Sequence, residues 1–290
     1  MTAASPVTAP FGERLADALS DSGPLCVGID PHPFLLDEWG LGRDAAGLRD
    51  FGLRVVEATA GGAAVVKPQV AFYERAGSAG LAALEDVLAA ARAAGLLVVG
   101  DAKRGDIGTT MDGYADAWLD PGSPLRVDAL TVSPYLGWGS LVATGRRARE
   151  VGAGLFVLAA TSNPEAHALQ TAVLAAGPRA GRTVAGGIVD DVLDDNATAG
   201  ETRLGSIGLV LGATVDLPAA GVDVARLTTT PVLAPGFGAQ GATFADLPRR
   251  FGAAAGSVLA SVSRSVLSAG PSGLAAAVRR DAEEVRSCLA

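Results

Sequence analysis

Residues 96–103 have the sequence Leu-Leu-Val-Val-Gly-Asp-Ala-Lys, an uninterrupted apolar run that ends in charged residues. Such a run, without alternation of polar and apolar residues, is typical of a strand buried on both faces of a parallel sheet. Short runs of β-branched and apolar residues recur before and after it. The sequence therefore predicts eight strands, at Leu25–Asp30, Ala64–Gln69, Leu96–Lys103, Ala129–Ser133, Leu155–Thr161, Ile207–Ala213, Pro231–Pro235 and Ser257–Val262.

Segments with helical periodicity separate these strands. Eight strand–helix units in about 260 residues favour an α/β fold of the (β/α)₈ TIM-barrel type, although periodicity leaves an open doubly wound sheet possible. No repeat, charge block or linker divides the chain, so residues 1–290 are predicted to form a single barrel domain. An extra N-terminal helix at Phe11–Ser20 would close the bottom or side of the barrel. The other expected helical segments are Leu48–Ala60, Gly80–Ala94, Gly139–Val151, Ser272–Leu289 and a less regular helical excursion at Ala166–Leu204.

The composition limits the class of protein. The chain has 290 residues, 49% of them hydrophobic, and a formal net charge of −8. The apolar content excludes disorder as the main state, and the acidic balance disfavours nucleic acid and anionic membranes as partners. Two isolated cysteines, Cys26 and Cys288, indicate a reducing compartment. Residues 1–10 do not resemble a signal peptide, and the apolar runs are too short to cross a bilayer, so we expect a cytoplasmic protein.

Charged residues in the predicted strands gather at their carboxyl ends, at Asp30, Lys67, Asp101 and Lys103. In a parallel barrel these ends share the face that carries the active site. Lys67 and Lys103 are the only lysines among 23 basic residues, which favours positions that need a compact, tunable ammonium group rather than arginine. A structural ion pair sealing the barrel is the alternative. Because buried ions are costly, four of them on three successive strands favour a functional site.

Alternating aspartates and lysines have a chemical consequence, because each keeps its neighbours charged. Such an array would stabilise negative charge developing on a carbon atom, and a lysine would then protonate that carbon. The two histidines, His32 and His167, are isolated, so no metal-ligand cluster and no metal are predicted. His32 follows the first strand, and we interpret it as a loop residue rather than a catalytic one.

Two later segments predict a phosphate site. Residues 234–241, after the seventh strand, contain three glycines that would let backbone N–H groups approach an anion closely. Residues 261–264, after the eighth strand, supply Arg264, whose guanidinium suits two-pronged phosphate contact. Phosphate sites in barrels commonly follow strands seven and eight, so the pair of segments carries more weight than either alone.

The charged run resembles a known family. Residues 99–110, Val-Gly-Asp-Ala-Lys-Arg-Gly-Asp-Ile-Gly-Thr-Thr, are similar to the Asp-x-Lys-x-x-Asp signature of orotidine 5′-phosphate decarboxylase and its Ile-Gly-x-Thr continuation. The resemblance spans roughly residues 25–265, and its Lys-Pro-Gln segment and the excursion after strand five resemble the longer bacterial subgroup. The other matching segments are Asp30 in Val-Gly-Ile-Asp-Pro, Lys67 in Val-Lys-Pro-Gln, Thr161-Ser162-Asn-Pro, the loop 235–241 and Ser263-Arg264.

This resemblance implies decarboxylation of orotidine 5′-monophosphate (OMP) to uridine 5′-monophosphate (UMP) and CO₂, the last step of pyrimidine nucleotide synthesis, by a barrel enzyme without cofactor. It implies that Lys103 protonates C6 of the pyrimidine and that Asp101 lies beside the departing carboxylate. Lys67 and Asp30 would contact the ribose hydroxyls and maintain the charge network. Sequence alone leaves open that Lys67 is the catalytic lysine.

The same resemblance implies a homodimer, in which Asp106 and Thr110 reach into the partner subunit's site. Ser162 would contact the base, and Gln240 and Arg264 would bind the phosphate. The candidate catalytic residues are therefore Lys103, Asp101, Asp106 and Lys67. The candidate substrate-binding residues are Asp30, Lys67, Thr110, Ser162, Gln240 and Arg264.

Two other interpretations remain open. A metal-dependent phosphosugar decarboxylase or aldolase of the same barrel group could carry a similar Asp-x-Lys-x-x-Asp run. Those relatives resemble one another in having Glu where this chain has Lys67, and a lysine there would repel the metal. A non-catalytic barrel that binds nucleotide phosphates would need the phosphate loop and Arg264 but not the two lysines.

Overall fold

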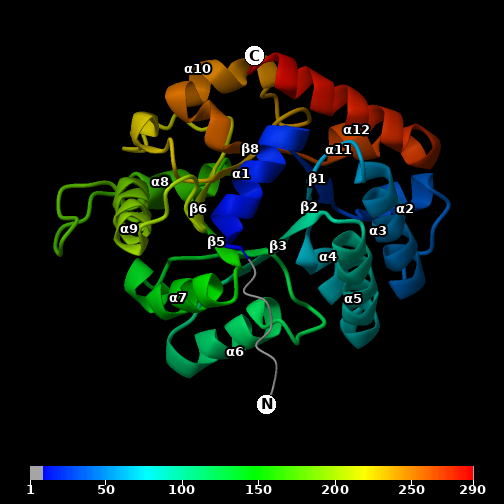
Figure 1. Cartoon of the computed structure of the whole chain (residues 1–290), viewed down its shortest axis with the longest axis horizontal. Coiled ribbons are helices and arrows are strands. Elements are labelled where there is room, and N and C mark those ends of the chain that lie inside the picture. The colour runs from blue at the N-terminus through cyan, green and yellow to red at the C-terminus, as the bar shows by residue number, and fades with distance from the viewer. Residues whose placement is uncertain (1–8, 290) are drawn as a thin grey trace.

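The computed structural model describes residues 9–289. Its eight strands form one closed parallel barrel, and each strand pairs with the next strand in the chain until β8 pairs with β1. Figure 1 shows this barrel in the middle of the molecule, surrounded by helices. The predicted TIM barrel is therefore confirmed, and the open sheet is excluded. The strands are β1 (Leu25–Ile29), β2 (Val65–Pro68), β3 (Leu97–Arg104), β4 (Ala129–Val132), β5 (Gly154–Ala160), β6 (Ile207–Leu211), β7 (Val232–Pro235) and β8 (Val258–Val262).

Helices follow the strands and cover the outside of the barrel (Figure 1). The predicted excursion after β5 divides into an irregular part and the regular helix α9, which packs against β5 and β6. The helices are α1 (Phe11–Ser22), α2 (Pro33–Glu38), α3 (Ala45–Thr59), α4 (Val70–Glu74), α5 (Gly77–Ala93), α6 (Gly108–Leu119), α7 (Val142–Glu150), α8 (His167–Gln170), α9 (Val184–Ala199), α10 (Leu247–Phe251), α11 (Arg264–Leu267) and α12 (Gly270–Ser287).

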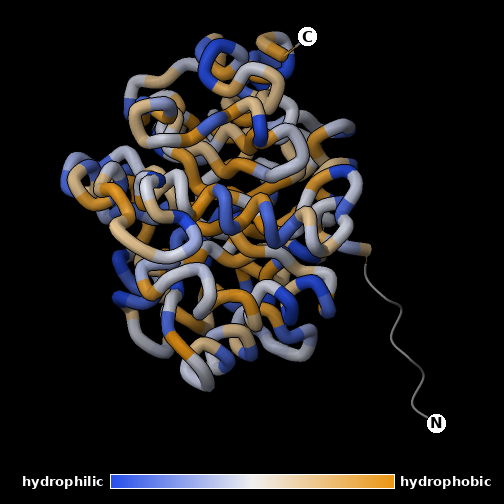
Figure 2. The backbone as a smooth tube through the Cα atoms, turned by 90° about the vertical axis from the view of Figure 1, so that its left-hand side faces the viewer, coloured by the Kyte–Doolittle hydropathy of each residue, from blue (hydrophilic) through white to orange (hydrophobic). Residues whose placement is uncertain are grey.

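The apolar residues form two cores, one on each face of the sheet. Successive side chains of a strand point to opposite faces, so Val66 and Val98 pack outward under the helices whereas Val65 and Val99 fill the barrel. This arrangement explains why the strands are apolar without alternation. Figure 2 shows the resulting distribution, with hydrophobic segments in the centre and hydrophilic segments toward the periphery.

Helix α1 closes the amino end of the barrel. Phe11 and Leu15 are fully buried in the inner core, and the Phe11 ring packs edge-on against Phe156 of β5 at a centroid distance of 6.0 Å. Glycine permits this close approach, because a Cβ on Gly154 would lie 2.3 Å from the Phe11 ring. Because helix α1 closes the amino end, the carboxyl ends of the strands form the open face of the barrel.

Among residues 9–289, no helix has both the length and the apolar character needed to span a membrane.

Candidate active site

A cavity of about 640 Å³ opens at the carboxyl ends of the strands. Charged side chains line it on the side of β1–β3, and the loops after β5, β7 and β8 complete its wall. This face is where a TIM barrel carries its active site. Seven of the residues singled out in the sequence lie together there: Asp30, Lys67, Asp101, Lys103, Ser162, Gln240 and Arg264.

Asp101 is the centre of the charged wall. Its Oδ2 accepts a hydrogen bond from Lys67 Nζ at 3.0 Å, and its Oδ1 accepts one from Lys103 Nζ at 2.5 Å. The Lys67 and Asp101 side chains are 8% and 10% exposed, whereas the Lys103 side chain is 48% exposed. Lys67 is therefore an internal counter-ion, and Lys103 presents its ammonium group to whatever enters the cavity.

The array keeps its charges at neutral pH. Burial alone would lower the pKa of Lys67, but the negative charges of Asp101 and Asp30 raise that pKa above its ordinary value. Burial alone would raise the pKa of Asp101, but Lys67 and Lys103 hold that pKa well below its usual range through charge and hydrogen bonding. Asp101 is therefore a carboxylate and Lys67 an ammonium group throughout the physiological range.

An irregularity in β3 brings Lys103 into this position. The β3–β4 register pairs Gly100 with Leu130 and Arg104 with Val132, so three residues of β3 lie opposite the single residue Thr131. Lys103 has φ = +50°, the one described non-glycine residue with positive φ. This conformation costs about 1–2 kcal/mol for an L-residue and occurs where function demands it. The bulge allows Asp101 and Lys103 to face each other within the cavity.

The opposite wall of the cavity is apolar. Strands β5, β6 and β7 contribute one aliphatic side chain each: Leu158, Val210 and Leu233. A low-dielectric surface facing the ions strengthens their electrostatic field. A ligand in the cavity would therefore lie between a charged wall and an apolar one.

The loop after β7 makes a tight turn beside the cavity. Gly236, Gly238 and Gly241 all have positive φ, and the Gly238 N–H donates to the Ala242 carbonyl at 2.8 Å. A Cβ on Gly238 would lie 2.8 Å from Ser265 Cβ, so glycine is required for this close packing. Arg264, at the start of α11, lines the cavity beside this loop and has no ion-pair partner among residues 9–289. The loop and Arg264 together provide a place for an anion.

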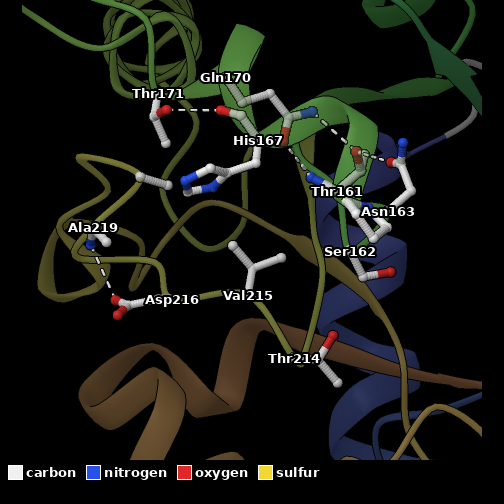
Figure 3. Close-up of a pocket in the computed structure, with 12 residues that line it drawn as sticks. Thr161, Ser162, Asn163, His167, Gln170, Thr171, Thr214, Val215, Asp216 and Ala219 are labelled. Atoms are coloured by element: carbon white, nitrogen blue, oxygen red, sulfur yellow. Dashed lines mark hydrogen bonds between the residues drawn. The ribbon is translucent and has the colours of Figure 1, made fainter.

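The loop after β5 carries Ser162 into the cavity. Gln170 fixes the start of this loop, because its side chain accepts a hydrogen bond from the Thr161 N–H and donates one to Thr161 Oγ1, both at 2.9 Å. Ser162 Oγ donates to Gln240 Oε1 at 3.1 Å and so links the loops after β5 and β7. Figure 3 shows the contacts between Thr161 and Gln170 beside a second cavity of about 430 Å³, into which the His167 side chain extends between the loops after β5 and β6.

Two of the predicted site residues lie elsewhere. Asp106 and Thr110, in the loop after β3 and at the start of α6, do not line the cavity of their own chain. Asp106 Oδ1 accepts the Ile107 N–H at 2.8 Å, and the Ile107 side chain beside it is 61% exposed. This surface position is the one that a contribution to a neighbouring subunit would require.

The structure adds three cavity residues whose roles the sequence did not indicate. Gln69 Nε2 donates to Asp101 Oδ2, and Thr131 Oγ1 donates to Asp101 Oδ1, each at 3.0 Å. A polar residue within the apolar run Ala129–Val132 was the available signal for Thr131. His32 lines the cavity with its ring packed 4.4 Å from that of Phe72. Burial lowers the pKa of His32, so the imidazole is neutral at pH 7.

The charged wall does not offer a metal site. Within residues 9–289, no group of three or more His, Cys, Asp or Glu side chains is arranged to hold a metal ion. Asp101 is already paired with two ammonium groups, which would repel a cation.

Comparisons with known proteins agree with this geometry. The model of the orotidine 5′-phosphate decarboxylase / HUMPS family matches residues 23–279. The orotidine 5′-phosphate decarboxylase of Streptomyces coelicolor is 54% identical over 283 residues, which cover 97% of this chain and 98% of the relative. That of a Nocardioides species is 57% identical over 258 residues, which cover 89% and 92%.

Solved structures are similar over the same length. A structure from Streptomyces avermitilis has a TM-score of 0.91 and 54% identity, covering 98% of this chain and 97% of its own. Leishmania donovani OMP decarboxylase has a TM-score of 0.75 and 31% identity, covering 96% and 98%. The similarity therefore extends over nearly the whole barrel, including the segments that line the cavity.

Proposed function

Because the chain belongs to the orotidine 5′-phosphate decarboxylase family and decarboxylates OMP to UMP and CO₂, we propose that Lys103 is the proton donor of this reaction. The observation that carries this assignment is the bridging of two ammonium groups by one buried carboxylate, Asp101. Of the two lysines, Lys103 is the exposed one and Lys67 the buried one, which supports Lys103 as the group that meets the substrate.

The reaction breaks the bond between C6 of the pyrimidine and its carboxylate carbon, which leaves as CO₂. The electron pair of that bond stays on C6, where the ring offers no electron sink in its plane. The Lys103 ammonium group stabilises this charge and transfers a proton to C6, and solvent then reprotonates the amine. Because Asp101 and Lys67 are charged before the substrate arrives, the field needs no reorganisation at the moment of bond cleavage.

The charged wall and the apolar wall of the cavity suit the substrate carboxylate and the CO₂ product, respectively. We assign the substrate carboxylate to the vicinity of Asp101, where two like charges approach each other until CO₂ departs. The aliphatic side chains of β5–β7, Leu158 and Leu233 among them, suit a neutral CO₂ product and exclude water from the carbanion. The charge arrangement therefore favours the transition state over the bound substrate.

The remaining contacts hold the nucleotide. Asp30 Oδ1 is buried with no hydrogen-bond partner among the described residues, which suits a ribose hydroxyl, and Lys67 lies beside it. We assign the pyrimidine edge to Ser162 and the phosphate to Gln240, Arg264 and the loop after β7. The phosphate lies far from C6, so its binding energy is available to order this loop over the substrate.

We further propose that the active enzyme is a homodimer whose sites are shared. Asp106 and Thr110 would enter the partner's cavity and complete its charged wall, with Asp106 as a second carboxylate near the partner's lysine pair. Two observations support this assignment. These residues lie outside their own cavity, and the exposed apolar side chain of Ile107 between them fits an interface.

The function is tested by following OMP absorbance with purified protein in buffer containing excess chelator. We expect stoichiometric conversion to UMP and CO₂ at the same rate with and without chelator, because ammonium groups rather than a metal provide the positive charge. Loss of turnover in chelator would instead favour the metal-dependent members of this barrel group. Binding of UMP without any turnover of OMP would favour a non-catalytic nucleotide-binding barrel.

A further inference from the structure

We propose that Thr131 is a positioning residue for the reaction, which sets the geometry of Asp101 and Lys103 through its hydroxyl group. This inference rests on the proposed function, because it assigns Thr131 no chemistry of its own. Thr131 lies in the middle of β4, is 1% exposed, and lines the floor of the cavity.

The hydroxyl of Thr131 contacts both Lys103 and Asp101. It accepts the backbone N–H of Lys103 at 2.9 Å, and it lies 3.0 Å from Asp101 Oδ1 and 3.4 Å from the Gly100 carbonyl oxygen. A hydroxyl has a single proton, and the nearer, charged oxygen of Asp101 is its stronger acceptor. Thr131 therefore receives a hydrogen bond from the backbone of the proton donor and gives one to that donor's counter-ion.

The bulge in β3 explains why a side chain is needed at this point. Three residues of β3 face one residue of β4, so the Lys103 N–H has no carbonyl of the sheet opposite it. Lys103 also holds a positive φ, a conformation that persists only when its surroundings fix it. The Thr131 hydroxyl replaces the missing ladder acceptor and holds the Lys103 backbone in place.

The donor set of Asp101 distinguishes Thr131 from its other neutral partner. Gln69 and Lys67 donate to Oδ2, whereas Thr131 and Lys103 donate to Oδ1. Thr131 is thus the neutral donor on the oxygen that faces the proton donor, and the only one of the four that also contacts the Lys103 backbone. Removing its hydroxyl would free the Asp101 carboxylate to rotate and the Lys103 backbone to relax.

The test compares Thr131→Val, Thr131→Ser and wild type by steady-state kinetics with OMP and by UMP affinity. Valine keeps the size and the β-branch of threonine, so we expect a folded protein with kcat reduced about 10- to 100-fold. KM and the UMP dissociation constant should change less than about threefold, because the ribose and phosphate contacts remain. Thr131→Ser restores the hydroxyl and should recover most of the lost kcat.

The matched control is Thr144→Val. Thr144 lies on α7, is 2% exposed, and its hydroxyl has no hydrogen-bond partner among the described residues. Its substitution makes the same change in a buried site and should leave kcat unchanged. A wild-type kcat in Thr131→Val, or an equal loss in Thr131→Ser, would overturn the inference. If wild type itself fails to decarboxylate OMP, the proposed function fails instead.

Discussion

The Asp101 carboxylate accepts four hydrogen bonds, two from lysine ammonium groups and two from the neutral side chains of Gln69 and Thr131. Lys67 and Gln69 lie at the end of β2, Thr131 lies on β4, and Lys103 lies on β3 beside Asp101, so the barrel fixes the directions from which these donors approach. Lys67 neutralises the carboxylate from inside, and Lys103 is left oriented toward the cavity.

The depressed pKa of Asp101 predicts a change in acid stability. In the unfolded chain Asp101 takes up a proton near pH 3.8, whereas the folded protein keeps it ionised to lower pH. Unfolding therefore binds an extra proton below about pH 4, and the free energy of unfolding falls on acidification by up to about 1.4 kcal/mol per pH unit from this group. Asp101→Asn should show a shallower acid slope in urea denaturation between pH 5 and pH 3.

The control for this measurement is Asp50→Asn on α3. The Asp50 side chain is 53% exposed, and its carboxylate comes no closer than 3.9 Å to the guanidinium group of Arg49. Its removal should leave the acid slope close to that of the wild type. Equal slopes in Asp101→Asn and wild type would show that Asp101 is not held ionised by its lysines.

The charged residues of the site could be predicted from sequence because charged side chains are unusual within or directly after apolar strand sequences. Asp30, Lys67, Asp101 and Lys103 interrupt or end apolar runs, and the rule that parallel strands share a carboxyl face brings them together. Thr131 could not be assigned in the same way. Its contacts depend on the register shift between β3 and β4, and no local pattern in either strand encodes that shift.

At the level of elements, the strands were predicted more accurately than the loops. All eight strands lie within one or two residues of the predicted ranges, because a strand buried on both faces must be apolar throughout. The predicted helix at Gly139–Val151 instead begins at Val142, after a short 3₁₀ turn at Trp138–Ser140. Helix boundaries depend on capping and tertiary contacts rather than on apolar periodicity alone.

The excursion after β5 was predicted as irregular, and its physical order comes from contacts that are distant in sequence. Thr183 caps α9 through the Gly186 N–H, and its hydroxyl also donates to the Ala220 carbonyl beyond β6. Arg182 contacts Asp190 within the excursion and the Gly221 carbonyl outside it. These tertiary bonds replace the repeated apolar pattern that makes a helix or strand predictable.

At the level of the whole molecule, one end of the barrel contributes packing that stabilises the fold, and the other end carries the charged site. Helix α1 closes the amino end with buried aromatic contacts, and the charged array occupies the carboxyl end. The single-domain organisation of residues 1–290 stays a prediction. The proposed dimer adds a further division, because a complete charged wall would then require two chains.

The shared site predicts complementation between two inactive variants. Lys103→Ala and Asp106→Ala should each lose activity alone. In a mixed dimer one site would combine Lys103 from one chain with Asp106 from the other and would be complete. Random exchange of equal amounts makes half the dimers mixed, so about a quarter of wild-type activity should return. If Asp106→Ala is inactive alone and mixed dimers form but remain inactive, Asp106 acts within its own chain. Full activity of Asp106→Ala alone would show that Asp106 takes no part in the reaction.

The most direct test of the account is the turnover of OMP by Lys103→Ala, measured alongside its affinity for UMP. The account predicts that decarboxylation falls by at least about 10³-fold, because both the stabilising charge and the transferable proton are lost. UMP affinity should change little, since the ribose and phosphate contacts lie elsewhere in the cavity. Turnover within about tenfold of the wild type would contradict the assignment of Lys103 as proton donor.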